Sequence, residues 1–389
     1  MKSDKKKICF VSGSRADYWL LRSLLFLVDK DSDLDLCIIA TGSHLSPLYG
    51  LTYKDIESDG FIINAKVDII HNDDSSLGVT NAISKAIKGI GEELDAIKPD
   101  MVVLLGDRYE ILSAAIAALV SKVPVAHIHG GELTPNCYDD AIRHSITKMA
   151  HLHFVANSVF KKRLIQLGEQ SSTIHTVGAL GVDAVKKIKR LKKIELETVL
   201  GIKFKDKNLL VTFHPVTLSK CDIGLELKEL LDALAELEST LILFTLPNAD
   251  SDSRVIIDMI STFVTSNKNA RLIKSMGQVN YFSFISHADG VVGNSSSGLL
   301  EIPSFKKGTI NIGDRQNGRP CASSVINCKS RKKDILLALK KLYSKQFQIN
   351  LVKTINPYGS AGAANKIYKA IKNHDLGTGT AKQFNDVIF

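Results

Sequence analysis

The chain has 389 residues, of which 44% are hydrophobic and 23% are charged. This length exceeds one typical domain, so two domains are expected, each with its own core. The composition excludes a disordered, collagen-like or disulfide-stapled chain. The sequence has 50 Lys and Arg against 41 Asp and Glu, a net charge of +9. This mild excess suits an anionic ligand, but it is spread along the chain and does not indicate nucleic-acid binding.

Two further features of the sequence concern its environment. The longest apolar stretches, such as residues 111–120, are shorter than the ~20 residues that cross a bilayer. The first residues lead into a strand-like segment and not into a secretory apolar region. The 6 cysteines form no CxxC pair, and several lie in apolar runs where a reduced, buried thiol is expected. We therefore expect a cytoplasmic protein that does not bind membranes.

Short β-branched runs alternate with helical periods along the first half of the chain. Strands are predicted at residues 8–11, 36–40, 101–105, 123–128, 152–156 and 174–177, with helices between several of them. The strand at 101–105 is almost wholly apolar, as a buried parallel strand should be. A charged helix is predicted over residues 183–193, and we interpret its basic cluster as a solvated helix face.

A second alternating series follows this charged helix. Strands are predicted at residues 209–213, 241–246, 271–273, 290–292 and 309–312, and a helical tail at 362–372. Two successive series predict an α/β fold with two doubly wound, Rossmann-like domains, which bind ligands beyond the carboxyl ends of their strands. We place the domains at residues 1–180 and 181–360, with a C-terminal helix in 361–389.

Polar clusters follow most of these strands. In chain order they are Gly13–Arg15, Gly106–Arg108, His127–Glu132, Asp139–His144, His214–Pro215, Pro247–Asp250, Gly293–Gly298 and Gly313–Arg315. Any one of them could be a helix cap, as Asp107 could be for the helix that follows it. So many polar groups at strand ends exceed what capping requires. We therefore expect them to form a functional site.

The two halves of the chain contribute different chemistry to this site. The first half supplies the cations Arg15 and Arg108. It also supplies four carboxylates: Asp107, Glu132, Asp139 and Asp140. The second supplies phosphate-type ligands and an acceptor suited to ribose hydroxyls: Ser295, Ser296, Arg315 and Glu301. This division fits a nucleoside diphosphate on the C-terminal domain whose attached group projects towards acids on the N-terminal domain.

Several other classes of site are disfavoured by the motifs. Neither a GxxxxGK[ST] loop nor a GxGxxG turn follows a predicted strand, which argues against an NTPase and a dinucleotide enzyme. His127 and His129 share one face of a strand, but they lack an HxxxH or cysteine partner. No metal is therefore expected.

The motifs occur in an order that resembles the hydrolysing UDP-N-acetylglucosamine 2-epimerases of sialic-acid biosynthesis. They are Gly13–Tyr18, Thr41–Ser46 with Tyr49–Thr52, Gly106–Arg108, His129–Glu132, Asp139–His144, Phe213–Thr217, Pro247–Asp250, Gly293–Gly298 and Gly313–Gln316. The resemblance implies a glycosyltransferase-B-like pair of Rossmann domains, with the C-terminal helix crossing back to the first. It implies conversion of UDP-N-acetylglucosamine and water to N-acetylmannosamine and UDP, without a cofactor or metal. It also implies a homodimer or homotetramer.

The same resemblance assigns roles to individual residues. The nucleotide-contacting positions are Arg15, Arg108, His214, Asn248, Ser295, Ser296, Glu301 and Arg315. The catalytic carboxylates are Asp107, the acidic region around Glu132, and Asp139. Relatives often carry a glutamate directly before the Gly-Gly pair, where this chain has His129, so either Glu132 takes over or His129 acts as the acid/base. The choice between Asp139 and Asp140 is open as well.

The expected mechanism is an anti elimination followed by a hydration. Asp107 or Asp139 removes the C2 proton while UDP leaves C1, which gives 2-acetamidoglucal. The leaving diphosphate is stabilised by His214, Arg15, Arg315 and the turn at Ser295–Ser296. Water then adds to the double bond, guided by Glu132 with Asp139 or His129.

Three alternatives remain open from the sequence. The first is the same chemistry on UDP-2,4-diacetamido-2,4,6-trideoxyglucose, on the way to legionaminic acid. The second is a non-hydrolysing 2-epimerase, whose relatives carry a Pro-Glu-Glu type motif where this chain has Asp139 and Asp140. The third is a UDP-sugar-binding module without catalysis.

Overall fold

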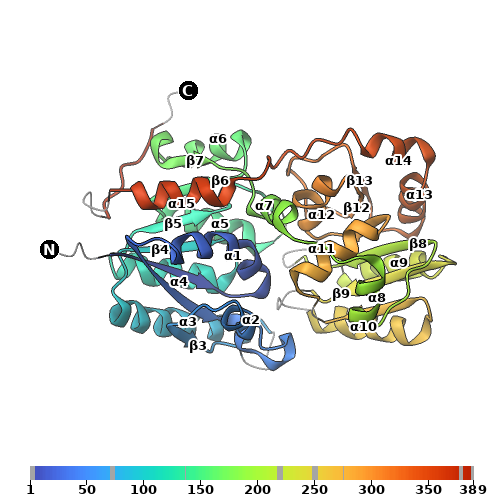
Figure 1. Cartoon of the computed structure of the whole chain (residues 1–389), viewed down its shortest axis with the longest axis horizontal. Helices are drawn as coiled ribbons and strands as arrows, with labels where there is room; N and C mark the ends of the chain where they lie inside the picture. Colours follow the sequence, from blue (N-terminus) through green and yellow to red (C-terminus); the bar gives the residue numbers. More distant parts are fainter. Residues whose placement is uncertain are drawn as a thin grey trace. The chain divides into compact units, whose positions relative to one another are not determined.

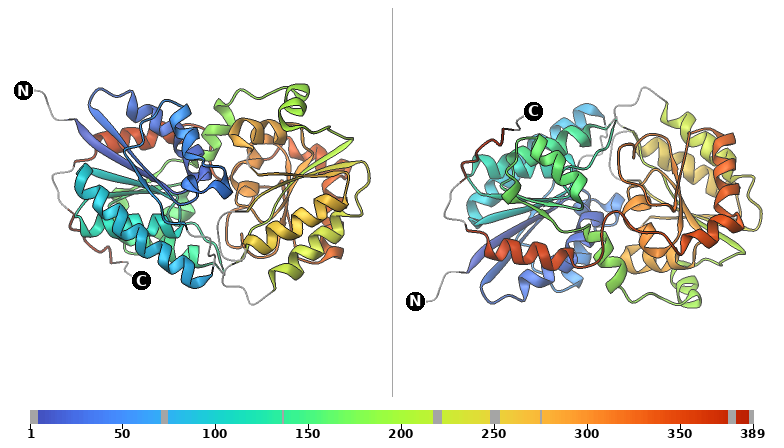
Figure 2. Two further views of the ribbon diagram at one scale, coloured as in Figure 1. Left: turned by 90° about the horizontal axis from the view of Figure 1, so that it is seen from below. Right: turned by 90° about the horizontal axis from the view of Figure 1, so that it is seen from above.

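The computed structural model describes residues 5–70, 75–135, 137–216, 222–247, 253–274, 276–375 and 380–386. The chain divides into two compact units. Unit 1 comprises Met1–Glu132, Asp139–Ala184 and Tyr358–Phe389, and unit 2 comprises Leu133–Tyr138 and Val185–Pro357. Each unit is a parallel sheet with helices on both faces (Figures 1 and 2). In the described ranges, no helix has the length and apolar character needed to cross a membrane.

Unit 1 is built on a seven-stranded sheet in the order β3-β2-β1-β4-β5-β6-β7. The strands are β1 (Lys6–Ser12), β2 (Leu34–Thr41), β3 (Ala65–Val67), β4 (Met101–Leu105), β5 (Val125–Ile128), β6 (Leu152–Val155) and β7 (Ile174–Thr176). The helices are α1 (Arg15–Asp29), α2 (Tyr53–Ser58), α3 (Ser76–Ile97), α4 (Tyr109–Val120), α5 (Tyr138–Met149), α6 (Ser158–Gln166), α7 (Leu180–Lys187) and α15 (Ala363–Asn373), with short 3₁₀ helices η1 (Gly42–Leu45), η2 (Pro47–Tyr49) and η3 (Ser171–Thr173). The strand order reverses between β1 and β4, the point where doubly wound sheets place their ligands.

The C-terminal helix α15 completes the core of unit 1. Its apolar face buries Ile367 and Ile371 in the cluster that also contains Leu21 and Leu24 of α1. Burying an aliphatic side chain of this size contributes about 1.5–3 kcal/mol. The fully buried Asp183 of α7 accepts hydrogen bonds from three backbone N–H groups at the start of α15, among them Ala364 N at 2.8 Å. A carboxylate from a distant helix therefore caps α15.

Unit 2 is built on a six-stranded sheet in the order β10-β9-β8-β11-β12-β13. The strands are β8 (Lys207–Thr212), β9 (Thr240–Thr245), β10 (Ala270–Ile273), β11 (Gly290–Gly293), β12 (Gly308–Ile312) and β13 (Val325–Cys328). The helices are α8 (Lys193–Leu200), α9 (Ile223–Leu234), α10 (Ser253–Ser266), α11 (Gly277–His287), α12 (Ser297–Leu300), α13 (Lys332–Leu342) and α14 (Lys345–Leu351), with the 3₁₀ helix η4 (Ile302–Phe305). Here the order reverses between β8 and β11, which pair from Leu209 with Gly290 to Thr212 with Gly293.

Every strand predicted from the sequence is present, and the structure adds the edge strands β3 and β13. The helix predicted over residues 183–193 is wrong in its second half, because α7 ends at Lys187 and α8 begins at Lys193. Like charges three or four residues apart destabilise a helix, which works against a continuous helix through this basic run. The break is held instead by hydrogen bonds, including Leu191 N to Ser283 Oγ at 2.9 Å.

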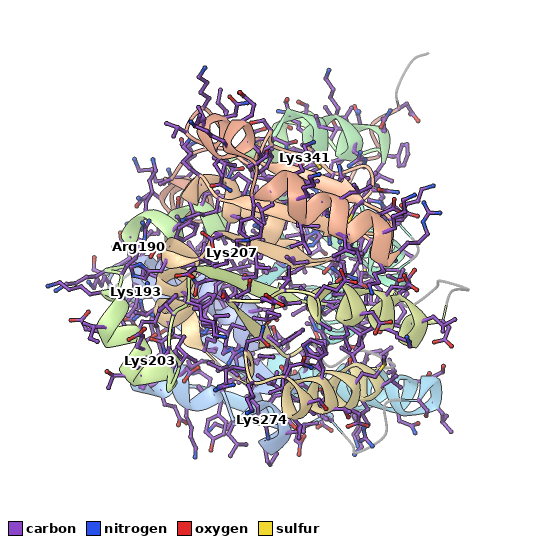
Figure 3. The ribbon with its side chains drawn as sticks, turned by 90° about the vertical axis from the view of Figure 1, so that its right-hand side faces the viewer. Arg190, Lys193, Lys203, Lys207, Lys274 and Lys341 are labelled. Atoms are coloured by element: carbon purple, nitrogen blue, oxygen red, sulfur yellow. The ribbon has the colours of Figure 1, made fainter. Side chains whose placement is uncertain are left out.

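Basic side chains around this break lie against aromatic rings. Arg190 lies 4.8 Å from the centroid of Phe305, and Lys193 lies 5.0 Å from that of Phe204 (Figure 3). Such contacts are worth about 0.5–1 kcal/mol at exposed sites. Three of the basic residues labelled in Figure 3 contact rings of unit 2 in this way: Arg190, Lys193 and Lys207, whose Nζ lies 4.6 Å from the centroid of Tyr343.

Candidate functional site

A buried arginine gathers the acidic segments of unit 1. Arg143 of α5 has a side chain that is 1% exposed. Its Nη2 donates to Asp107 Oδ2, at the end of β4. Its Nη1 donates to the Glu132 carbonyl at 2.9 Å and to Asp140 Oδ1 at 3.3 Å. A buried guanidinium requires acceptors of this kind. Three acidic segments separated in the sequence therefore meet at Arg143.

The first turn of α5 carries the two adjacent aspartates. Asp140 bonds to Arg143 and lies 3.6 Å from His144 Nε2. Asp139 is half-buried on the same turn. Asp140 is therefore a member of the cluster around Arg143, and Asp139 is its neighbour on the helix.

The turn after β5 places a histidine beside a glutamate. His129 has a φ of +68°, in the left-handed region that residues other than glycine seldom adopt, and Gly131 has a φ of +76°. A Cβ at Gly131 would lie 2.8 Å from the Phe160 carbonyl, so the turn requires glycine there. The turn brings His129 Nδ1 to 2.7 Å from Glu132 Oε1, and both residues are buried.

The neighbouring His127 has a different environment. Its Nε2 bonds to the Gly106 carbonyl at 2.8 Å, and its Nδ1 bonds to Thr147 Oγ1 at 3.2 Å. Burial lowers the pKa of His127 to about 3. It is a neutral core histidine. In the described ranges no group of three or more His, Cys, Asp or Glu side chains is arranged to hold a metal ion.

The predicted cation Arg108 is paired with a buried acid of unit 1. Its Nε donates to Glu110 Oε1 at 2.8 Å, with the two side chains 10% and 1% exposed. Burial, and then the charge of Glu110, raise the pKa of the nearby Asp17 to about 6 against the opposing effect of Arg108. Arg15, the first residue of α1, is half-buried, and burial lowers its pKa against the opposing charge of Asp55.

In unit 2, Asn294 joins the ends of the two central strands. Its Oδ1 accepts from His214 N at 2.7 Å, and its Nδ2 donates to the His214 carbonyl at 2.8 Å. Gly293 has φ +136°, and a Cβ there would overlap the Thr212 carbonyl. Only glycine lets β11 approach β8 this closely. His214 and the loop after β11 are therefore fixed together at the point where the strand order reverses.

The loop after β12 adds cationic and amide donors to this position. Arg315 Nη1 and Gln316 Nε2 donate to the Asn294 carbonyl at 3.2 and 2.8 Å. Arg315 Nε is buried, and within the described part of the chain it has no acceptor. Leaving a buried donor unsatisfied costs about 1–3 kcal/mol. A phosphate oxygen is the kind of acceptor that a guanidinium binds best.

The predicted serines lie beside this arginine loop, directly after β11. Ser295 and Ser296 are half-buried and precede α12. Glu301, at the end of α12, is 7% exposed. Burial raises the pKa of Tyr281, and the charge of Glu301 adds to the rise against a hydrogen bond from Ser297.

Some functional candidates were missed by the sequence prediction, and one lies outside the described residues. Asn248 is outside them. Arg143 and Gln316 occur inside the quoted motifs but were not singled out. Arg319 was missed altogether: it donates to the Leu133 carbonyl at 2.6 Å, to Thr134 Oγ1 at 3.0 Å and to Gln316 Oε1 at 2.9 Å. It thereby holds, within unit 2, the segment that follows Glu132 in the chain.

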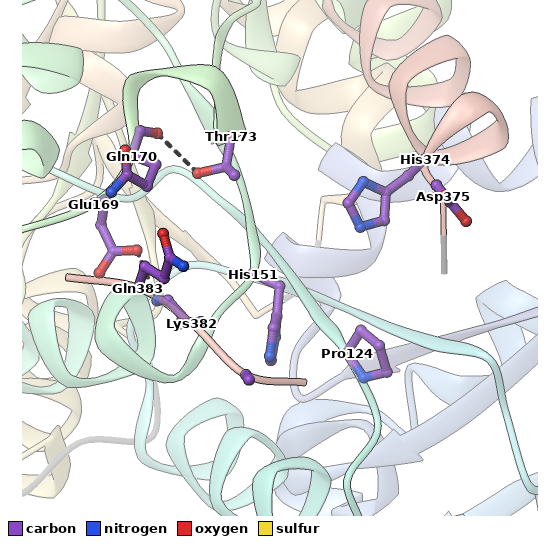
Figure 4. A pocket seen from close by; sticks show the side chains of 10 residues that line it. Pro124, His151, Glu169, Gln170, Thr173, His374, Asp375, Lys382 and Gln383 are labelled. Atoms are coloured by element: carbon purple, nitrogen blue, oxygen red, sulfur yellow. Dashed lines mark hydrogen bonds and ion pairs between the residues drawn. The ribbon is translucent and has the colours of Figure 1, made fainter. Parts of the chain in front are cut away.

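Figure 4 shows a separate cavity of about 230 Å³ in unit 1. Pro124 and His151, which line it, directly precede β5 and β6. The cavity therefore lies at the amino ends of the strands, whereas the acidic cluster lies at their carboxyl ends. Glu169 in its wall accepts hydrogen bonds from three side chains: His153, Lys148 and Lys382. Burial would raise the pKa of Glu169, but these bonds lower it to about 2. This cluster fastens the segment at residues 380–386 to unit 1.

Comparisons with known proteins identify the family. The family model described as UDP-N-acetylglucosamine 2-epimerase matches residues 27–372. The GDP/UDP-N,N'-diacetylbacillosamine 2-epimerase (hydrolyzing) of Campylobacter jejuni is 42% identical over 98% of this chain and 100% of its own. The polysialic acid biosynthesis protein P7 of Escherichia coli is 38% identical over 95% of this chain and 94% of its own.

Solved structures share the fold. A co-structure of S. aureus MnaA with UDP has a TM-score of 0.80 at 18% identity and covers 98% of this chain and 100% of that one. The predicted fold class, two doubly wound Rossmann-like domains of the glycosyltransferase-B-like type, is confirmed. The sequence matches place the chain within the UDP-N-acetylglucosamine 2-epimerase family, among its hydrolysing UDP-sugar 2-epimerases.

Proposed function

We propose that this protein cleaves a UDP-2-acetamido sugar to UDP and the free sugar inverted at C2. The observation that carries the proposal is that the carboxylates of Asp107 and Asp140 and the backbone carbonyl of Glu132 converge on the buried Arg143. Inversion at C2 requires proton transfer from and to a carbon that is not appreciably acidic. Two carboxylates held by one rigid cation, which also fixes the backbone of Glu132, suit such a task, because proton-transfer groups must be fixed in place.

The first stage is an anti elimination. A carboxylate, Asp107 or Asp139, takes the C2 proton while the bond from C1 to the UDP oxygen breaks. The electrons of the C2–H bond form the C1=C2 double bond of 2-acetamidoglucal, and the C1–O electrons leave with UDP. Positive charge that develops at C1 weakens the C2–H bond, so loss of UDP assists loss of the proton.

The leaving diphosphate needs positive and hydrogen-bonding groups, which unit 2 provides. Arg315 offers its buried Nε, and Asn294 fixes both His214 and the Arg315 loop. Ser295 and Ser296 add hydroxyl groups at the end of β11. We assign the UDP moiety to this cluster, with Glu301 as an acceptor for the ribose. Arg15 and Arg108 of unit 1 are the remaining candidate nucleotide contacts.

The second stage hydrates the double bond. A water oxygen bonds to C1 and loses a proton to a carboxylate, and C2 receives a proton on the face opposite to the one from which it was removed. His129 and Glu132 form the candidate acid/base pair for this step, with Asp139 or Asp140 beside them. The sum of the two stages consumes one water and releases UDP and the 2-epimeric sugar.

Two substrates fit this chemistry. The family description and the sequence motifs favour UDP-N-acetylglucosamine, which would give N-acetylmannosamine. The name of the Campylobacter relative, at 42% identity, favours UDP-2,4-diacetamido-2,4,6-trideoxyglucose. Both carry the 2-acetamido group and the UDP that the mechanism uses. Steady-state rates of purified protein on each UDP-sugar will identify the substrate by the larger kcat/KM.

The proposal is tested with Asp107→Asn, measured for UDP binding by calorimetry and for UDP release from the better substrate. We expect binding within about threefold of wild type and turnover reduced by about 10²–10⁴-fold, the usual contribution of a general base. Near-wild-type turnover would refute the role of Asp107. Failure of wild type to release UDP from either sugar would refute the proposed function.

A further inference from the structure

The side chain of His129 is held at one ring nitrogen and unsatisfied at the other. Its Nδ1 bonds to Glu132 Oε1 at 2.7 Å. Its Nε2 is buried, and no donor or acceptor of the described residues bonds to it. His129 differs in this respect from His127 of the preceding strand, because both ring nitrogens of His127 have hydrogen-bond partners. An unsatisfied buried polar atom is destabilising and calls for a functional explanation.

The geometry around His129 is fixed from several sides. His129 has a left-handed backbone conformation, which residues other than glycine adopt only when the surrounding structure imposes it. A Cβ at Gly130 would lie 3.2 Å from His127 Nδ1, so the chain after His129 is tightly packed. Arg143 holds the Glu132 carbonyl at 2.9 Å, and Arg163 donates to the Gly131 carbonyl. The imidazole therefore has one defined position relative to the acidic cluster.

Glu132 also determines which nitrogen of the ring carries the exchangeable proton. A carboxylate accepts a proton but does not donate one, so Nδ1 must be the N–H that bonds to it. Nε2 is then left as the atom that gains or loses a proton. This is the relation in which a carboxylate orients a histidine for general acid–base catalysis. The side chain of His129 as a whole is 9% exposed, whereas its Nε2 is buried.

We infer that His129 is the catalytic residue that delivers the proton to C2 in the second stage, and that Glu132 is a positioning residue acting through it. This inference rests on the proposed function. In the step, the N–H bond of a protonated His129 Nε2 breaks and its proton forms the new C2–H bond. The π electrons of the double bond supply that bond, water oxygen bonds to C1, and a neighbouring carboxylate takes the proton lost by water.

The experiment follows both stages separately in His129→Gln, Glu132→Gln and Glu132→Asp. Release of UDP measures elimination, and proton NMR of the sugar distinguishes 2-acetamidoglucal from the hydrated 2-epimer. His175→Gln is the matched control, because His175 lies on β7 of the same unit and contacts the Phe154 ring instead of the acidic cluster. We expect this control to carry out both stages at the wild-type rate.

His129→Gln should release UDP within about tenfold of the wild-type rate but hydrate at least about 100-fold more slowly, so that 2-acetamidoglucal accumulates. Glu132→Gln should shift the products in the same direction, and Glu132→Asp should restore part of the hydration. If His129→Gln does not fold, His129→Asn is used in its place with the same expectation.

Three results would overturn the inference. One is hydration by the His129 variant at the wild-type rate. Another is an equal loss of elimination and hydration in both variants, which is the result of a merely structural role. The third is blocked hydration in Glu132→Gln alone, which would make Glu132 the acid. Absence of turnover in wild type would instead refute the proposed function.

Discussion

Deprotonation of the Asp17 carboxyl group should lower the free energy of unfolding of unit 1 as the pH rises. The side chain of Asp17 is buried beside Glu110, and burial is the main reason that its pKa is raised from 3.8 to about 6. Because the folded state binds this proton more tightly than the unfolded state, the associated stability is fully present below pH 3.8 and is lost as the pH passes 6. A difference of about two pKa units corresponds to about 3 kcal/mol. Asp17→Asn removes the titration and therefore the loss.

The assay is urea denaturation of both proteins at a series of pH values between about 4 and about 7. Trp19 is the single tryptophan of the chain and lies on α1 with Asp17, so its fluorescence reports on unit 1. The free energy of unfolding of Asp17→Asn minus that of wild type should rise by about 2 kcal/mol over this range, since part of the total of about 3 kcal/mol is already lost at about pH 4. Asp29→Asn, an exposed position at the end of the same helix, is the control and should show a flat difference. A flat difference for Asp17→Asn as well would refute the reasoning.

Two more predictions concern the stability of unit 1, and a third concerns turnover. Glu169→Gln should destabilise unit 1 by about 1–3 kcal/mol, because it removes the buried carboxylate to which Lys148, Lys382 and His153 bond. This difference in the free energy of unfolding should shrink as the pH falls from 4.5 towards 2, because wild type loses the same ion pairs in that range. The control is Glu57→Gln, which removes the exposed ion pair of Glu57 with Lys66 and is measured by the same denaturation. Asp183→Ala should remove the cap of α15 and lower the free energy of unfolding, followed by Trp19 fluorescence, by at least about 2 kcal/mol. Asp183→Asn should lose less stability than Asp183→Ala, and equal losses would contradict the capping role. Arg319→Ala should lower kcat by about 10–100-fold without weakening UDP binding, because it releases the segment next to Glu132. Arg319→Lys should not restore kcat, because three guanidinium nitrogens make the contact. A wild-type kcat in Arg319→Ala would contradict this role.

Strands of the central sheets could be predicted from the sequence because their apolar runs have no other favourable location. β4 is buried at all five residues, and its sequence MVVLL has no polar position. The edge strands β3 and β13 were not predicted, whereas the edge strands β7 and β10, which are equally short and also partly exposed, were. The break between α7 and α8 escaped prediction because it depends on a distant partner, Ser283, that the local pattern does not contain.

Positions of the candidate site residues at strand ends could also be predicted, but their pairings could not. Spacing along the chain leaves open which of His129 and Glu132 acts, because the turn between them depends on left-handed backbone at two positions. Arg143 is a single arginine on a helix in the sequence. Its importance arises only when β4, the turn after β5 and α5 come together.

The identity of the product made in deuterated water tests the central claim most directly. Purified protein is incubated with each of the two UDP-sugars, and the product is followed by proton NMR. The account predicts UDP and a free sugar whose C2 is inverted and carries deuterium, since the proton added to C2 comes through groups that exchange with solvent. A product that is still a UDP-sugar, or a free sugar that keeps its original hydrogen and configuration at C2, would contradict it.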